Sequence, residues 1–252
     1  MTLNVPCRYY RVCTDLDVPC VESEFDHVER CLPIPVEQAA VVLVDVWSTH
    51  YIDSWLQRAS QVTQARIVPI LEAARRVGLC VIHAPSPKVA ERYGVSPSPP
   101  SAPEPDWPPP AFRSICRAGE YAAFGRQQEP RLQQASARYE TELDIAECAR
   151  PLAGEPVIST GDQLHALLAQ RRILHLFYAG FATNWCVFLR DYGVLAMSGA
   201  GYNIILIRDA TTGVEFHDTV DELAATRIAV REMETKHAWS TATHDFLAAC
   251  GA

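Results

Sequence analysis

The sequence has no apolar stretch long enough to cross a bilayer, no C-x-x-C pair, and only two lysines, Lys88 and Lys236, in 252 residues. Because a spanning helix needs about 20 consecutive apolar residues, we expect no membrane segment. The net charge of −8 argues against nucleic acid and anionic membrane surfaces as partners. The first residues, 1–4, are typical of neither a signal nor a transit peptide. The sequence therefore predicts a cytoplasmic protein that acts on a small molecule.

Cysteine is plentiful but irregularly spaced. The nine cysteines are an odd number, which favours free thiols in a reducing compartment over a disulfide framework. With 48% hydrophobic residues, a chain of this length can bury one large core. We expect a single domain over residues 39–252, preceded by an irregular N-terminal extension at residues 1–38.

Apolar runs and helical patterns alternate along the expected domain, with no internal repeat. This alternation predicts an α/β fold with a parallel, Rossmann-like sheet between two layers of helices. The expected strands are 40–46, 79–83, 156–159, 173–179 and 202–208, and the expected helices are 60–77, 162–170, 185–198, 218–233 and one from Thr243.

Residues 84–153 interrupt the alternation as a long insert. Two Pro-rich stretches, 96–103 and 107–110, favour extended polyproline II structure and exclude helix. The insert also carries apolar aromatic side chains that can pack, namely Phe112, Tyr121 and Phe124. Long loops beside an active-site edge are often functional, so we expect an ordered lid.

Cys186 lies between an expected strand and an expected helix. We expect the strand 173–179 to be buried, and Asn184 to cap the helix that follows. The sulfur would then stand at a helix N-terminus, where the macrodipole favours thiolate over thiol. A strand-to-helix turn also presents the nucleophile in other hydrolases. Cys186 is therefore the candidate nucleophile, although most free cysteines are small core residues.

Asp45 directly follows the apolar run 39–44. Such runs are typical of strands buried on both faces of a parallel sheet, and open α/β sheets bind ligands at the carboxyl ends of their strands. Asp45 and Cys186 are therefore expected to face each other. A carboxylate in apolar surroundings at this edge of the sheet has a raised pKa and can exchange a proton with a thiol. The ordinary alternative is that Asp45 merely caps a loop.

The sequence resembles the isochorismatase-like cysteine hydrolase superfamily over residues 38–250. The most specific match is 179–187, Ala-Gly-Phe-Ala-Thr-Asn-Trp-Cys-Val, which fits the family's nucleophile turn "aGxxTNxCV". Asp45 matches the first-strand Asp, and Asp209-Ala210 matches the "DA" after the nucleophile helix. The resemblance implies that Cys186 is the nucleophile and Asp45 its base. It also implies an oxyanion hole made by the N–H groups of Ala182 and Cys186, with a cis peptide near Phe181-Ala182.

The third catalytic residue of the family, a Lys after the third strand, has no counterpart here. The corresponding region, 154–164, contains no Lys. Lys88 follows the second strand and is the leading candidate to supply the missing positive charge. Arg117 in the insert is the second candidate, but an Arg cannot exchange protons.

Several further side chains are expected to line the pocket: Trp47, His50, His83, Arg117, Phe181 and Trp185. His50, Asp53 and His83 are also the residues from which a zinc site could be built. The family's metal-binding stretch after the second strand is missing, however, so we expect no metal and no other cofactor. His50 and His83 are instead expected to donate hydrogen bonds. Glu215, in the loop after the expected strand 202–208, is a weak candidate to reach the pocket of a neighbouring subunit.

These residues predict a cysteine hydrolase that cleaves a C–N bond of a small amide or ureide through a thioester on Cys186, with Asp45 as base. Two alternatives remain: vinyl-ether hydrolysis of an isochorismate-like substrate, which needs no thiol, and a catalytically inactive member that acts as a binding protein. The resemblance also implies a homodimer or a larger homo-oligomer.

Overall fold

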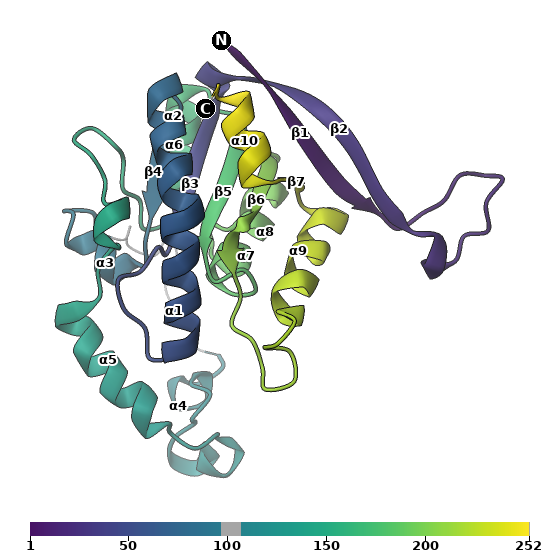
Figure 1. Cartoon of the computed structure of the whole chain (residues 1–252). Helices are drawn as coiled ribbons and strands as arrows, with labels where there is room; N and C mark the ends of the chain where they lie inside the picture. The colour runs from purple at the N-terminus through teal and green to yellow at the C-terminus, as the bar shows by residue number, and fades with distance from the viewer. Residues whose placement is uncertain (97–106, 252) are drawn as a thin grey trace.

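The computed structural model describes residues 1–96 and 107–251. Most of the first Pro-rich stretch, expected to be polyproline II, falls at 97–106 and lies outside the described residues. One seven-stranded sheet runs through the described chain in the order β2-β1-β7-β6-β5-β3-β4 (Figure 1). Its strands are β1 (Thr2–Arg11), β2 (Asp26–Pro35), β3 (Ala39–Val44), β4 (Cys80–Ala84), β5 (His175–Phe181), β6 (Asn203–Thr212) and β7 (Trp239–Thr241).

Helices cover both faces of the sheet, which confirms the predicted three-layer α/β architecture. The strands from β3 to β7 pair in parallel with one another. One face is covered by α1 (Asp53–Val62), α2 (Val68–Val77) and α10 (Thr243–Ala249). The other is covered by α6 (Gly161–Arg171), α8 (Val194–Gly199) and α9 (Ala224–Lys236) (Figure 1).

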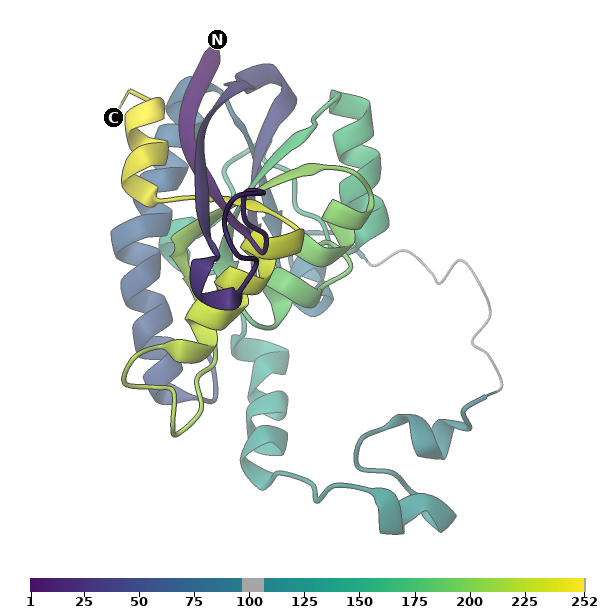
Figure 2. The same ribbon diagram turned by 90° about the vertical axis from the view of Figure 1, so that its right-hand side faces the viewer.

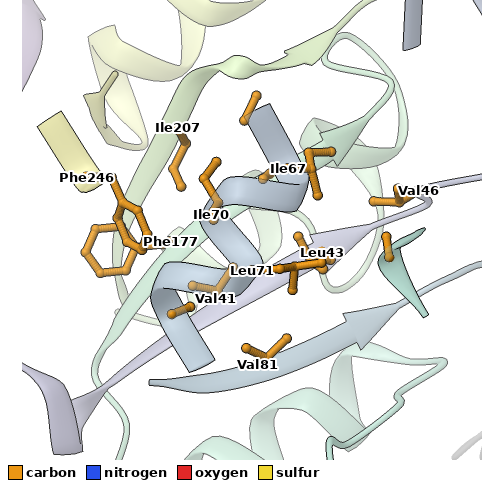
Figure 3. Packing of buried hydrophobic residues seen from close by; sticks show 14 of the residues in the cluster. Val41, Leu43, Val46, Ile67, Ile70, Leu71, Val81, Phe177, Ile207 and Phe246 are labelled. Atoms are coloured by element: carbon orange, nitrogen blue, oxygen red, sulfur yellow. The ribbon is translucent and has the colours of Figure 1, made fainter. Parts of the chain in front are cut away.

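The core explains the uninterrupted apolar run of β3. Every residue of this strand is buried, because helices pack on both of its faces. On one face Val41 and Leu43 lie beneath Ile70 and Leu71, which come from α2 (Figure 3). A short π-helical stretch, Thr63–Ile67, joins α1 to α2. The helix predicted at 60–77 therefore begins earlier, at Asp53.

The N-terminal segment, expected to be irregular, is a β-hairpin. In β1 the residues alternate between exposed and buried, and Leu3, Val5 and Cys7 are the buried ones. This period of two is the signature of a half-buried strand. β1 pairs antiparallel with β2 along its whole length and with β7 at Arg8 and Ser240. The expectation was wrong because prolines and acidic residues hid the alternation.

The insert contains three α-helices: α3 (Pro87–Glu91), α4 (Pro110–Arg113) and α5 (Pro130–Glu142). α3 packs against the core through the buried Val89 and Ala90, whereas α4 and α5 lie largely outside it (Figure 2). Phe112 and Tyr121 pack edge to face, with ring centroids 5.3 Å apart. After α5 the chain returns to the sheet edge, where Ile145 forms an antiparallel bridge with Trp47. The lid function of the insert stays a prediction.

Two short extended segments differ from the expected pattern. Residues 156–159 contribute only an isolated parallel bridge, between Val157 and His83. β7, with three residues, was too short to be predicted from periodicity.

Within the described ranges, no helix is long and apolar enough to span a bilayer.

Candidate active site

Asp45 lies directly beyond the end of β3. Its side chain is 1% exposed, and its backbone adopts a positive φ of 45°, a conformation that Asp tolerates better than most residues. The Asp45 amide donates a hydrogen bond to the carbonyl of Ala84 at 3.2 Å. The chain therefore turns sharply at the sheet edge and holds a carboxylate there, buried among apolar strands.

The Asp45 carboxylate contacts the side chains of Trp47, Arg190 and Cys186 and the backbone N–H of Ser86. The indole Nε1 of Trp47 donates to Oδ1 at 3.0 Å. The guanidinium of Arg190 lies 3.5 Å from Oδ2. Trp47 is in turn held by its bridge to Ile145 and by the hydrogen bond from the Ala146 amide to the Val46 carbonyl. The expected position of Trp47 beside Asp45 is thus observed.

The turn that carries Cys186 begins where β5 passes closest to β3. Gly180 has a φ of 116°, and a Cβ at this position would lie 2.0 Å from the carbonyl oxygen of Val44. Only glycine fits such an approach. The peptide bond between Phe181 and Ala182 is cis, in agreement with what the resemblance implied.

The end of β6 fixes the remainder of this turn. The Thr183 amide donates to the Thr212 carbonyl at 3.2 Å, and the Thr183 and Thr211 hydroxyls lie 2.7 Å apart. Asn184 donates to the Val214 carbonyl and accepts from the Val214 amide. The expectation that Asn184 caps the next helix is therefore wrong, because its amide is fully used in tying the turn to the loop after β6.

The helix expected at 185–198 is broken, and the break creates the site. α7 (Cys186–Leu189) is a single turn, and α8 begins only at Val194. Between them, Asp191 accepts a hydrogen bond from the Gly161 amide at 2.6 Å. Tyr192 is buried and donates its hydroxyl proton to the Pro85 carbonyl. These tertiary contacts outweigh the helical pattern of the apolar residues.

Arg190 ends the short helix one turn after Cys186. Its amide donates to the Cys186 carbonyl at 3.2 Å, so the two side chains leave the same side of the helix. Sequence reasoning missed Arg190, although the four-residue spacing from the nucleophile was a usable signal. Its Nε atom is buried without a hydrogen-bond partner among the described residues.

The three groups shift one another's proton affinities. Burial raises the pKa of Asp45, and Arg190, Cys186 and Trp47 offset this only in part. Burial, followed by the charge of Asp45, raises the pKa of the Cys186 thiol to about 12. Burial opposes the charge on Arg190, but the Asp45 carboxylate outweighs it and raises the pKa of Arg190. The resting site thus holds a neutral thiol at Cys186 and a permanent cation at Arg190, both beside Asp45.

This protonation state corrects one expectation. The helix N-terminus was expected to favour thiolate at Cys186. The helix is only four residues long, and the dipole effect, about 1 kcal/mol, is smaller than the cost of burying a charge beside Asp45. The Cys186 thiol is therefore protonated in the resting site.

Comparison with known proteins places this arrangement in a family. The sequence matches the model of the isochorismatase domain over residues 39–243. The chain belongs to the isochorismatase family. Members of this family are hydrolases. No curated protein matches the sequence.

Solved structures of the isochorismatase fold are similar in architecture but distant in sequence. A cysteine hydrolase from Pseudomonas syringae pv. phaseolicola is 17% identical, with a TM-score of 0.56 and coverage of 87% of this chain and 95% of the other. An isochorismatase from Pseudomonas putida is 19% identical, with a TM-score of 0.52 and coverage of 85% and 93%. At these identities the similarity shows the fold alone.

The cation that contacts Asp45 differs from the two candidates named for the missing family Lys. Lys88 forms an ion pair with Glu140 of α5 at the surface. Arg117 stacks on the Phe112 ring, 4.1 Å from its centroid, within the insert. Arg190 contacts the carboxylate instead. The expectation for Lys88 was wrong because α3 starts at Pro87 and places Lys88 toward α5.

His50 lies in an aromatic stack beside the site. Its ring centroid is 5.6 Å from that of Trp47 and 4.3 Å from that of Trp55. Burial lowers the pKa of His50 to about 4, so the ring is neutral at physiological pH. Its Nδ1 accepts a hydrogen bond from the Ile52 amide at 3.2 Å, which leaves Nε2 as the donor.

His83 is fully buried and lies against Glu155 instead of in the pocket. The two side chains are 2.9 Å apart, and Arg75 contacts the same carboxylate at 2.7 Å. Asp53 begins α1. Within the described part of the chain, no three His, Cys, Asp or Glu side chains gather as a metal site.

The remaining expected pocket residues divide between core and surface. Phe181 is buried at 1% exposure and packs edge to face on Trp55. Trp185, next to the nucleophile, is 40% exposed. Glu215 accepts hydrogen bonds from the Ala225 and Thr226 amides. It therefore caps α9 of its own chain instead of reaching toward another subunit.

Proposed function

We propose that this protein is a cysteine hydrolase that cleaves the C–N bond of a small amide or ureide, with Cys186 as nucleophile, Asp45 as base and Arg190 as the fixed cation. The observation that carries the proposal is the contact between Asp45 and Arg190 at 3.5 Å, beside a cysteine whose pKa depends on both. The chemistry needs only these side chains and water.

In the first half of the reaction the thiol adds to the substrate carbonyl. Asp45 accepts the thiol proton as the sulfur attacks, and its raised pKa makes it a stronger base than an exposed carboxylate. The carbonyl oxygen becomes an oxyanion, which we assign to the N–H groups of Ala182 and Cys186. The C–N bond then breaks, the amine leaves with the proton from Asp45, and a thioester remains on Cys186.

The second half releases the acid. Asp45 accepts a proton from water as the water oxygen attacks the thioester carbonyl. The C–S bond breaks, and the thiolate takes the proton back from Asp45. Arg190 exchanges no proton in either half. Its positive charge stabilises the Asp45 carboxylate before attack and the sulfur anion when the C–S bond breaks.

We further propose that the active protein is a homodimer or larger homo-oligomer in a reducing compartment. Support for association comes from exposed apolar side chains near α7 and α9, including Trp185, Leu189, Phe216 and Ile228. A cavity of about 360 Å³ lies among these helices. All nine cysteines are free, which supports the reducing compartment.

Trapping of the thioester tests the function. A panel of small amides and ureides is incubated with the protein, quenched in acid and digested. A mass increase equal to the acyl group is expected on the Cys186 peptide, and it should be absent from Cys186→Ser. Because the two side chains are close in size, Cys186→Ser should keep its melting temperature. Turnover within about tenfold of wild type in Cys186→Ala would instead favour vinyl-ether hydrolysis, which needs no thiol.

A further inference from the structure

A second cavity, of about 490 Å³, lies between the N-terminal hairpin and the core. Its lining residues come from β1 and β2 on one side and from β6 and the start of α10 on the other. None of its lining residues belongs to the site of Cys186. The lining comprises Pro6, Cys7, Arg8, Glu29, Arg30, Cys31, Arg208, His244 and Asp245.

Three arginines line this cavity in a chain with an excess of acidic residues. Arg8 is paired with Glu234, its Nε lying 2.9 Å from Oε1. Arg208 is half-buried, and its guanidinium contacts the Ser240 hydroxyl at 3.5 Å. Among the ion pairs of the described residues, neither Arg208 nor Arg30 has a carboxylate partner. Two guanidinium groups therefore offer unused donors to one cavity.

The charge of Arg208 is compensated only in part by its surroundings. Burial, followed by the charge of Arg8, lowers the pKa of Arg208, and the more distant carboxylates of Glu234, Asp209 and Asp245 offset this shift only in part. Holding a half-buried cation beside a like charge costs free energy unless an anion compensates it. Glu29 and Asp245 also line the cavity, but Glu29 is exposed and Asp245 contacts His244 at 3.3 Å. Neither is within ion-pair distance of Arg208.

We propose that this cavity binds a small anion with a carboxylate or phosphate group, held between the guanidinium groups of Arg208 and Arg30, with Arg8 beside them. Guanidinium groups suit both anions, because their paired N–H donors match two acceptor oxygens. Arg30 belongs to the hairpin and Arg208 to β6. The bound anion therefore links the hairpin to the catalytic sheet and stabilises the folded chain.

Binding is measured on the full chain with two probes, inorganic phosphate and succinate, by calorimetry and thermal melting at constant ionic strength, with chloride as reference. We expect saturating probe to raise the melting temperature by about 3 °C. Arg208→Gln should weaken binding at least about tenfold. Arg227→Gln removes the same charge from exposed α9, outside the cavity, and should bind like wild type. The probe that binds more tightly identifies the natural anion as a phosphate or a carboxylate.

Alkylation of Cys31 gives a local readout that does not depend on catalysis. Cys31 is exposed and lines the cavity, so either bound probe should slow its reaction with iodoacetamide. Cys13 and Cys20, exposed in the hairpin loop, should react at an unchanged rate. Arg30→Gln, at an exposed position, should abolish the protection even if Arg208→Gln disturbs folding. Equal binding by wild type, Arg208→Gln and Arg30→Gln, or the absence of Cys31 protection by both probes, would overturn the proposal.

Discussion

Two carboxylates near the carboxyl ends of adjacent strands, the buried Asp45 and the partly buried Glu155, differ in how strongly their surroundings stabilise a negative charge. Asp45 follows β3 and has Arg190 at 3.5 Å, the Trp47 indole, the Cys186 thiol and the Ser86 amide as partners. Glu155 lies beside His83 of β4. It accepts from Arg75 at 2.7 and 2.9 Å, from His83, and from the Leu152 amide.

The pKa values of the two carboxylates shift in opposite directions. Burial raises the pKa of Asp45, and its partners leave it raised. Burial also opposes the charge on Glu155, but Arg75, the Leu152 amide and His83 lower its pKa to about 2. A carboxylate with incomplete compensation can take and return a proton, whereas a fully compensated one is a structural anchor. The close two-point ion pair with Arg75 and the partial exposure of Glu155 separate the two roles.

The largest effect is expected for Asp45→Asn, which removes the base while keeping the shape. The value of kcat/KM should fall about 10³-fold. Because the negative charge of Asp45 raises the pKa of Cys186, the pH midpoint for alkylation of the thiol should move down. A more acidic thiol with less turnover would show that proton transfer, and not thiolate content, limits the reaction. An upward shift of that midpoint would contradict this account.

Glu155→Gln should affect stability instead of turnover. Removing one partner of this partly buried ion pair leaves Arg75 and His83 uncompensated, so the free energy of unfolding should fall by about 3 kcal/mol. Glu140→Gln, which breaks the exposed pair with Lys88, should cost less than about 1 kcal/mol. Urea unfolding of both variants measures the difference. Similar losses in the two would contradict the anchoring role of Glu155.

The low pKa of Glu155 also predicts how the stability of the protein depends on pH. The pKa of Glu155 is about 2 in the folded chain, against an unfolded value of 4.5. Its stabilisation is therefore fully present above pH 4.5 and is lost as the pH falls toward 2. Wild type should lose stability over this window more steeply than Glu155→Gln.

Arg190→Met should reduce kcat/KM by about 30-fold, a loss of ~2 kcal/mol for one charged contact. Without the guanidinium, the pKa of Asp45 should rise further, so the acid limb of the pH–rate profile should move to higher pH. Arg190→Lys restores a positive charge and should move the limb back. A limb that stays in place in Arg190→Met would show that Arg190 does not act on Asp45.

Lys88→Met should have the smallest effect. Lys88 pairs with Glu140 at the surface, and exposed ion pairs contribute about 0–1 kcal/mol. Turnover should stay within about twofold of wild type. A larger loss would bring Lys88 back as the functional replacement for the family's lysine.

The parts of the site that could be predicted are those that lie within short, recognisable segments of the sequence. Asp45 follows an unbroken apolar run, and Cys186 lies in a distinctive turn, so both positions could be read directly. Arg190 could not, because its place depends on where the helix stops. That point is set by Asp191 binding the Gly161 amide and Tyr192 binding the Pro85 carbonyl, which are contacts between distant segments. Likewise, the donors around Glu155 converge from α2, β4 and a loop.

The N-terminal hairpin has a consequence for any shortened version of this chain. The family match begins at residue 39, yet β1 covers the free side of β7. Arg8 and His27 of the hairpin bind Glu234, whose side chain is 1% exposed. Cutting the chain at the family boundary would open an unpaired strand edge and strip a buried carboxylate of two partners. Open edges of this kind recruit other strands, so the trimmed protein should precipitate where the whole one does not.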